Sequence, residues 1–288
     1  MSKPSHEAAL IGIGIDVGGS GLRAASWTRV TDGWRLGASV EGVHRGSDVP
    51  ARIADAARAV ARRRGLASAS PIALGVAAPG RKTTDGRGIA DARNLPADPD
   101  WLGRLDDLLD ETFRLPARLT SDAEAALVGE RVVANGALVG HANALYLGPG
   151  TGLGVALLHE GVPHRVPRDR WNHARAGTPV EDAATLAAAT RAPARFRAAL
   201  AGVLRDVIGW ATASRVRPDV VLVRSRSGAA LRAVEFEELE AALDEAAQRA
   251  GVEVLLEPTV ARPHVACAGA LALEVGQIPA HPGGVQRT

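Results

Sequence analysis

The chain has 288 residues, 46% of them hydrophobic, and a formal net charge of +2 at pH 7. This length can bury a large core, as one α/β domain or as two lobes, and the scattered arginines form no basic run that would indicate nucleic acid binding. Cys267 is the only cysteine, which excludes an intramolecular disulfide and a multi-cysteine zinc site. No apolar stretch reaches 18 residues, so we expect no membrane contact and a soluble, cytoplasmic protein.

The first half of the chain begins with a pattern of three strands joined by tight turns. The apolar runs 10–17, 22–30 and 34–42 are separated by Gly-Gly-Ser and by Thr-Asp-Gly. Helical and buried-strand patterns then alternate. They are helix 48–65, strand 71–80, helix 100–113, strand 116–120 and helix 122–135. This order predicts a first α/β lobe over residues 1–136.

The second half repeats this beginning in character. Residues 143–164 again have the pattern of strand, glycine-rich turn and strand, which indicates two related lobes. The further expected elements are helices 180–190 and 194–215, strand 219–224, helix 235–250, strand 252–256 and helix 265–275. We therefore expect a second lobe over residues 137–288, whose final helix packs back on the first lobe.

Two glycine-rich turns, at 18–21 and 148–152, are candidates for phosphate binding. Neither fits the common helix-based signatures, because the chain has no Gly-Lys pair and the third glycine of GxGxxG falls on Val17 or Val155. A turn between strands can still offer backbone N–H groups to a phosphate. One such turn is more often an ordinary hairpin. Two of them, with Asp16 at a strand end, favour a ligand site.

Four blocks of sequence occur in order between residues 11 and 164. They are IGIDVGGSGLRAA (13–25), LGVAAPGRKTTDGRGIADARNLP (74–96), LTSDAEAALVGE (119–130) and LYLGPGTGLGVALLHEGVPH (145–164). Together they resemble the ROK family (repressors, open reading frames and kinases), a branch of the superfamily of sugar kinases, heat-shock ATPases and actin. The resemblance implies two actin-like (ribonuclease H-like) lobes, each a mixed sheet flanked by helices, with the active site in the cleft between them. It further implies a homodimeric kinase that uses ATP and Mg²⁺.

The resemblance makes Asp122 the candidate general base. Asp122 falls in the first turn of a predicted helix, where the helix dipole favours an ionised carboxylate that can accept a proton from a sugar hydroxyl. The sequence Ser121-Asp122-Ala123-Glu124 also spells a capping box. Because the box uses Ser121 and Glu124, it leaves Asp122 available for catalysis.

The resemblance also implies three further groups of site residues. Contacts with the acceptor fall on Asn94, Ser121, His173 and Glu181. Contacts with the nucleotide fall on Gly18, Gly19, Ser20, Gly150, Thr151, Gly152 and Gly228. Asp16 would hold Mg²⁺ through water. Two of these residues have equally good structural roles, since Asn94 can form the turn before Leu95-Pro96 and His173 can be an ordinary surface or core histidine.

Several positions depart from the family pattern. Ser121 replaces an asparagine, Arg170 replaces a glutamate, and residues 224–228 replace glycines, with Arg224 or Arg226 as candidates to reach a phosphate. The cysteines of the family's zinc loop are missing, so we expect no structural zinc. These departures favour an unusual acceptor, and we expect phosphorylation of a primary hydroxyl of a hexose, an amino sugar or a sugar-like C7-cyclitol.

The alternative is a catalytically degenerate regulator that binds a sugar or a nucleotide. The first strand is expected near residue 10, which leaves no room for an N-terminal helix-turn-helix, so this regulator would act without binding DNA directly. The presence of both Asp16 and Asp122 favours the kinase, because a protein that only binds ligands needs no general base.

Overall fold

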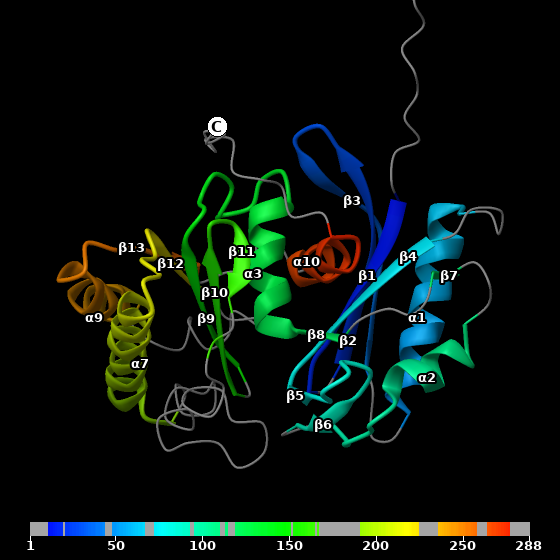
Figure 1. Ribbon diagram of the computed structural model, residues 1–288, viewed down its shortest axis with the longest axis horizontal. Helices are drawn as coiled ribbons and strands as arrows, with labels where there is room; N and C mark the ends of the chain where they lie inside the picture. Colours follow the sequence, from blue (N-terminus) through cyan, green and yellow to red (C-terminus); the bar gives the residue numbers. More distant parts are fainter. Residues whose placement is uncertain are drawn as a thin grey trace, which may run out of the picture.

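Figure 1 shows the computed structural model of the protein. The structure describes residues 11–19, 21–43, 48–66, 72–92, 95–109, 113–114, 119–150, 152–164, 166, 191–224, 236–257 and 264–276. The two large β-sheets stand side by side, with helices between them and further helices on the outer face of each sheet (Figure 1). Within the described residues, no helix is long and apolar enough to cross a membrane.

The first sheet is built from a three-stranded meander and parallel strands. Its order is β3-β2-β1-β4-β7, with β8 also paired to β4. The strands are β1 (Ile11–Val17), β2 (Gly21–Val30), β3 (Gly33–Val43), β4 (Ile72–Ala78), β7 (Phe113–Arg114) and β8 (Leu119–Ser121). β1, β2 and β3 pair antiparallel, whereas β4 runs parallel to β1 and to β8. A separate hairpin of β5 (Arg81–Lys82) and β6 (Ile89–Asp91) follows β4.

The second sheet repeats this topology. Its order is β11-β10-β9-β12-β13. The strands are β9 (Ala144–Pro149), β10 (Leu153–His159), β11 (Val162–His164), β12 (Val220–Arg224) and β13 (Glu253–Glu257). Again three antiparallel strands are followed by a strand that runs parallel to the first of them. The predicted fold class, two α/β lobes of the actin-like kind, is therefore confirmed.

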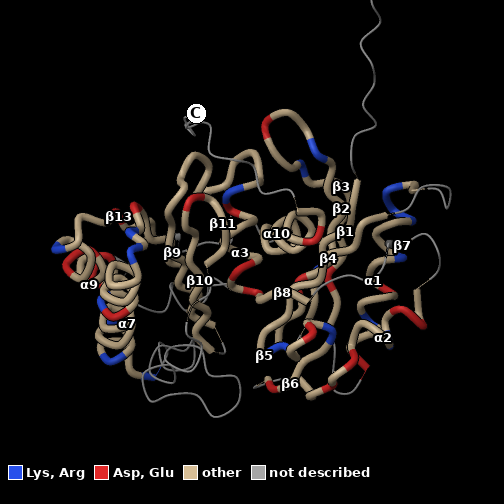
Figure 2. Tube along the Cα trace, in the orientation of Figure 1, with Lys and Arg blue, Asp and Glu red and all other residues tan. Residues whose placement is uncertain are grey.

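Outer helices bury one apolar face on each sheet. Helices α1 (Val49–Arg64) and α2 (Trp101–Asp106) share a core with β1 and β4, and helices α7 (Pro193–Ala213) and α9 (Phe236–Gln248) share one with β9 and β12. In α1 the buried residues Ile53, Ala57 and Val60 recur every three or four positions, as one face of a helix requires. Both signs of charge occur on α1, α2 and α7, whereas the charged residues within α9 are all acidic (Figure 2).

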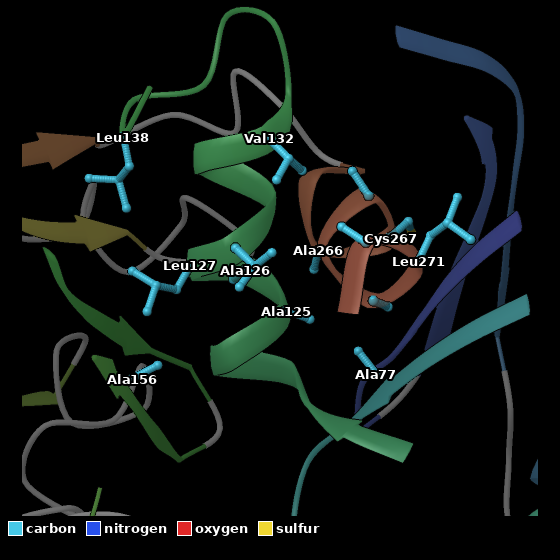
Figure 3. Close-up of a cluster of buried hydrophobic side chains, with 14 of the residues drawn as sticks. Ala77, Ala125, Ala126, Leu127, Val132, Leu138, Ala156, Ala266, Cys267 and Leu271 are labelled. Carbon is cyan, nitrogen blue, oxygen red and sulfur yellow. The ribbon is translucent and has the colours of Figure 1, made fainter. Parts of the chain in front are cut away.

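Helices α3 (Asp122–Val132) and α10 (Val265–Glu274) form the layer between the sheets. Small side chains dominate this layer, so the two helices approach each other and the strands closely (Figure 3). A Cβ atom on Gly14 of β1 would clash with the backbone of Cys267 in α10, and one on Gly269 would clash with the backbone of Ala125 in α3. α10 thus lies against β1 and β4 of the first sheet. The lobe boundary at residues 136 and 137 stays a prediction.

Several predicted elements differ in extent from the observed ones. The helix predicted over 100–113 ends at Asp106, and the helix predicted over 122–135 ends at Val132. The next residue, Val133, takes an extended conformation and forms an isolated bridge with Trp34 of β3. This contact between distant segments stops the helix before Asn135-Gly136. The helix predicted over 180–190 lies outside the described residues.

The residue before α10, His264, is a buried ionisable group in this central layer. It is 9% exposed, and its Nδ1 has no hydrogen-bond partner in the part of the chain that the structure describes. Burial lowers the pKa of His264 below its ordinary value; Glu41 opposes this and Arg23 adds to it. The folded protein therefore favours the neutral imidazole.

Stability is expected to fall in mild acid because of His264. His264 is protonated more easily in the unfolded chain than in the folded protein. The neutral, buried imidazole is therefore fully compatible with folding above about pH 6.5, and stability is lost as the pH falls from there through the lower pKa of the folded state. Urea unfolding at about pH 7.5 and about pH 5, for the wild type and for His264→Gln, measures this. The variant should lose less stability between the two pH values, and an equal loss would contradict the assignment.

Candidate active site

Strands β1, β4 and β8 run parallel and end at the same edge of the first sheet. Asp16 of β1 lies opposite Ala77 of β4, and Ala77 lies opposite Thr120 of β8. Neighbouring strands are about 4.8 Å apart, so the backbones of Asp16 and Thr120 are separated by about 10 Å. Asp122 begins α3 just after β8. The edge therefore brings Asp16 and the start of α3 together.

The side chain of Asp16 faces the layer between the sheets. Ile13, Ile15 and Val17 belong to the core that β1 shares with α1, whereas Gly12 and Gly14 meet α10. Because side chains alternate between the two faces of a strand, Asp16 lies on the same face as Gly14. Asp16 is only 3% exposed. A carboxylate that is this buried must be stabilised by its surroundings or by a bound cation.

The glycines of the first motif have two different roles. A Cβ atom on Gly12 or Gly14 would meet α10, and the same holds for Gly75, which lies opposite Gly14 on β4. These glycines therefore make room for a helix. Gly18 instead forms the turn after β1, where its N–H donates to the carbonyl oxygen of Gly21 at 2.7 Å. In the first motif, Gly18 and Gly19 therefore remain the described glycines that are candidates for phosphate binding.

The second glycine turn lies beside the start of α3. The N–H of Gly150 donates to the carbonyl oxygen of Gly152 at 2.8 Å, which closes the turn between β9 and β10. On β10, a Cβ atom on Gly154 would lie 3.1 Å from the Cβ of Ala123, the residue after Asp122. Figure 1 shows the β9–β10 turn and the carboxyl end of β1 on the side of the molecule where α3 begins.

Asp122 is half-buried at the first position of α3. Its Oδ1 accepts a hydrogen bond from the N–H of Ala123 at 3.0 Å. The predicted capping box is wrong, because the Ser121 side chain makes no capping hydrogen bond and Glu124 instead accepts from the hydroxyl of Thr120 at 3.4 Å. Ser121 is the last residue of β8, so its backbone is still extended.

The structure brings together the predicted site residues that it describes. These are Asp16 near the end of β1, Gly18 and Gly19 just after it, Ser121 and Asp122 at the start of α3, and Gly150 and Gly152 in the β9–β10 turn. Other predicted residues lie outside the described residues. They are Ser20, Asn94, Thr151, His173, Glu181 and Gly228, together with Arg170 and Arg226.

Sequence reasoning missed Lys82 at the same edge. Its ammonium group donates to the carbonyl oxygens of Ala78 at 2.6 Å and of Gly80 at 3.0 Å. Ala78 is the last residue of β4 and lies opposite Ser121. Lys82 thus places a positive charge at the edge that holds Asp16 and Asp122. The available signal was its rarity, since Lys3 is the only other lysine.

Arg224 does not serve as the phosphate contact considered from the sequence. It is 4% exposed, and its guanidinium forms an ion pair with Glu130 in α3, which is fully buried. Side chains alternate between the two faces of β12, so Arg224 points to the same face as Val220 and Leu222, which lie in the central layer. The prediction that Arg224 reaches a phosphate is therefore wrong.

The repeated sheet topology, together with two glycine turns that flank one helix start, defines a two-lobe α/β protein of the sugar kinase and actin superfamily. The model of the ROK family matches residues 12–166, which is more than half of the chain. The protein therefore belongs to the ROK family. A search of curated protein sequences found no match.

Three solved structures share this fold. A ROK hexokinase from Thermus thermophilus is 21% identical, with a TM-score of 0.66, and the match covers 93% of this chain and 99% of that one. An inorganic polyphosphate/ATP-glucomannokinase from Arthrobacter sp. strain KM is 22% identical, with a TM-score of 0.65 and the same coverage. A ROK glucokinase from Streptomyces griseus, in complex with glucose and AMPPNP, is 16% identical, with a TM-score of 0.62, and the match covers 92% and 99% of the two chains.

Proposed function

We propose that the protein is an ATP-dependent kinase that phosphorylates a primary hydroxyl of a hexose, an amino sugar or a sugar-like C7-cyclitol. The observation that carries this proposal is the position of Asp122, at a helix start flanked by the carboxyl end of β1 and by the β9–β10 turn. Membership of the ROK family supports it, as does the likeness to structures named as a hexokinase, a glucokinase and a glucomannokinase.

Asp122 acts as the general base in this reaction. Its carboxylate accepts the proton of the acceptor hydroxyl while the hydroxyl oxygen forms a bond to the γ-phosphorus of ATP. The bond between that phosphorus and the β–γ bridging oxygen breaks, so the products are the phosphorylated acceptor and ADP. In the two glycine turns the N–H groups of Gly18 and Gly150 donate within the turn itself, so Gly19 and Gly152 are the glycines whose N–H groups would face the phosphates. Ser121 and the half-buried start of α3 lie on the acceptor side.

Asp16 is the residue that would hold Mg²⁺. Mg²⁺ prefers oxygen ligands and is usually held by one or two carboxylates together with water and substrate phosphates. A buried carboxylate at the strand end that leads into a glycine turn suits this ligand set. Among the described residues, no group of three or more His, Cys, Asp or Glu could hold a metal ion. When bound, Mg²⁺ would neutralise charge on the transferring phosphoryl group.

Replacing Asp16 should weaken the use of Mg²⁺. Asp16→Asn keeps the size of the side chain and removes its charge, so we expect the Mg²⁺ concentration at half-maximal activity to rise by about 10- to 100-fold. In calorimetric titrations with AMPPNP, the gain in affinity that Mg²⁺ gives to the wild type should be smaller in Asp16→Asn. Asp107→Asn, an exposed change at the end of α2, is the matched control. An unchanged Mg²⁺ requirement in Asp16→Asn would remove Asp16 from the metal site.

The proposed function is tested with the purified protein, ATP, Mg²⁺ and a panel of hexoses, amino sugars and C7-cyclitols. Release of ADP above the rate without acceptor identifies a substrate. Acceptors that lack the primary hydroxyl should release no ADP above background. Gel filtration of the same preparation tests the homodimer that the family resemblance implies.

The second candidate function is a catalytically degenerate regulator that binds a sugar or a nucleotide. The departures at Arg170 and at residues 224–228 favour it, because both change positions where the family pattern has ligand contacts. A regulator would bind a sugar or AMPPNP in calorimetry yet release no ADP with any acceptor of the panel. The kinase would do both.

A further inference from the structure

Arg224 and Glu130 form a buried ion pair between the second sheet and α3. Nη1 of Arg224 donates to Oε1 of Glu130, and the two residues are 4% and 0% exposed. Oε2 of Glu130 accepts the backbone N–H of Ala137 at 2.8 Å, in the segment that connects α3 to β9. Each oxygen of the carboxylate therefore has a donor. The pair links the last residue of β12 to the last turns of α3.

The layer around this pair is largely apolar. Its buried hydrophobic residues are mostly alanines, valines and leucines from both sheets, α3 and α10, with Trp27, Trp34 and Tyr146 among them. Arg131 of α3 is a further buried charged residue. Removing two charges from water is costly, and an apolar pair of similar volume often gives equal or greater stability. A contribution to stability is therefore a weak explanation for a charged pair, rather than an apolar one, at Arg224 and Glu130. An ion pair with directed hydrogen bonds instead fixes one relative placement of the two groups.

That placement affects the proposed site through the second sheet. β12 lies next to β9, with Val223 opposite Leu147, and β9 leads directly into the turn at Gly150. α3 begins at Asp122, and Ala123 contacts β10 on the other side of the same turn. The ion pair between Arg224 and Glu130 therefore holds the strands that carry the second glycine turn against α3, the helix that begins at Asp122.

We propose that Arg224 and Glu130 are positioning residues. The pair sets the distance between the nucleotide-side turn and Asp122, without contact to ATP or to the acceptor. This inference rests on the proposed kinase function. It implies that loss of the pair weakens nucleotide binding and turnover, whereas affinity for the acceptor changes little.

The test compares Arg224→Met, Glu130→Gln and the double variant with the wild type. Arg205→Met, an exposed change on α7, is the control. Each single variant leaves a buried charge or a mispaired amide, so the Tm should fall by roughly 6–20 °C. The double variant removes both charges and should recover at least half of that loss. Turnover should fall about 10²-fold in all three, because a small misplacement of reacting groups has effects of this size.

Three readouts separate positioning from a structural role. They are the Kd of AMPPNP by calorimetry, kcat, and the KM of the acceptor. We expect a raised Kd and a reduced kcat with an unchanged acceptor KM, even where the double variant has regained its Tm. Arg224→Lys keeps the charge but loses the planar fork, so it should recover part of the Tm and of kcat. If Arg224→Met does not fold, Arg224→Lys takes its place in the three measurements.

Two results would overturn the inference. One is a double variant that regains both Tm and turnover, since the pair would then only support the fold. The other is a folded Arg224→Met or Arg224→Lys protein with wild-type AMPPNP affinity and kcat. A wild type that neither binds AMPPNP nor releases ADP is a different outcome, because it contradicts the proposed kinase function itself and the positioning role with it.

Discussion

Asp122→Asn is expected to lower kcat by about 10²- to 10⁴-fold, which is the usual contribution of a general base. Asparagine keeps the size of the side chain, and its amide oxygen can still accept the N–H of Ala123, so α3 should begin at the same residue. The Kd of AMPPNP and the Tm should stay close to those of the wild type. Steady-state kinetics on any acceptor found in the panel gives the measurement.

The control for this variant is Asp244→Asn, an exposed carboxylate on α9 far along the chain from the site. It should leave kcat unchanged. If Asp122→Asn turned over within about tenfold of the wild type, Asp122 would not be the base. Another residue at the edge of the first sheet would then have to accept the proton.

Gly14→Ala is expected to destabilise the protein by about 3 kcal/mol or more, or to prevent folding. The added methyl group would clash with the backbone of Cys267, and backbone atoms cannot rotate away as a flexible side chain can. α10 would have to move off β1, which would open the packed layer between the two sheets. Gly269→Ala should have a similar effect, because its methyl group would meet the backbone of Ala125 in α3.

Gly209→Ala supplies the matched control for these glycines. Gly209 lies in α7 with no atom within 4 Å of an added Cβ. There alanine should stabilise the helix by roughly 0.5–1 kcal/mol. Urea unfolding followed by far-UV circular dichroism measures all three variants. A Gly14→Ala protein that unfolds at the wild-type urea midpoint would contradict the close approach of α10.

The arrangement of strands could be predicted because it depends on local signals. Gly-Gly-Ser and Thr-Asp-Gly mark the turns between β1, β2 and β3, and the hairpin pattern repeats at residues 143–164. The structure confirms the first meander and the second hairpin, and the predicted helices and strands that it describes follow in the expected order. It adds the short strands β5, β6, β7 and β11, which were not predicted. Helix ends were predicted less well, since a distant strand residue, Trp34, determines where α3 ends.

The candidate site was predicted in part, and mainly from the family resemblance. Asp16 and Asp122 could be named from their motifs, but their meeting at one edge follows only from the parallel pairing of β1, β4 and β8. Two further facts depend on contacts between remote segments. Gly14 meets a helix near the end of the chain, and Arg224 pairs with Glu130, 94 residues earlier. No local spacing in the sequence encodes such contacts.

The central claim is transfer of the γ-phosphoryl group of ATP to a sugar-like hydroxyl at Asp122. Its most direct test is to incubate the protein with ATP, Mg²⁺ and each acceptor, and to identify the product by ³¹P NMR and mass spectrometry. We predict a phosphate monoester on the primary hydroxyl of one acceptor class, formed in equal amount to ADP and lost in Asp122→Asn. An acceptor that binds in calorimetry yet yields neither monoester nor ADP would contradict the kinase and favour the regulator.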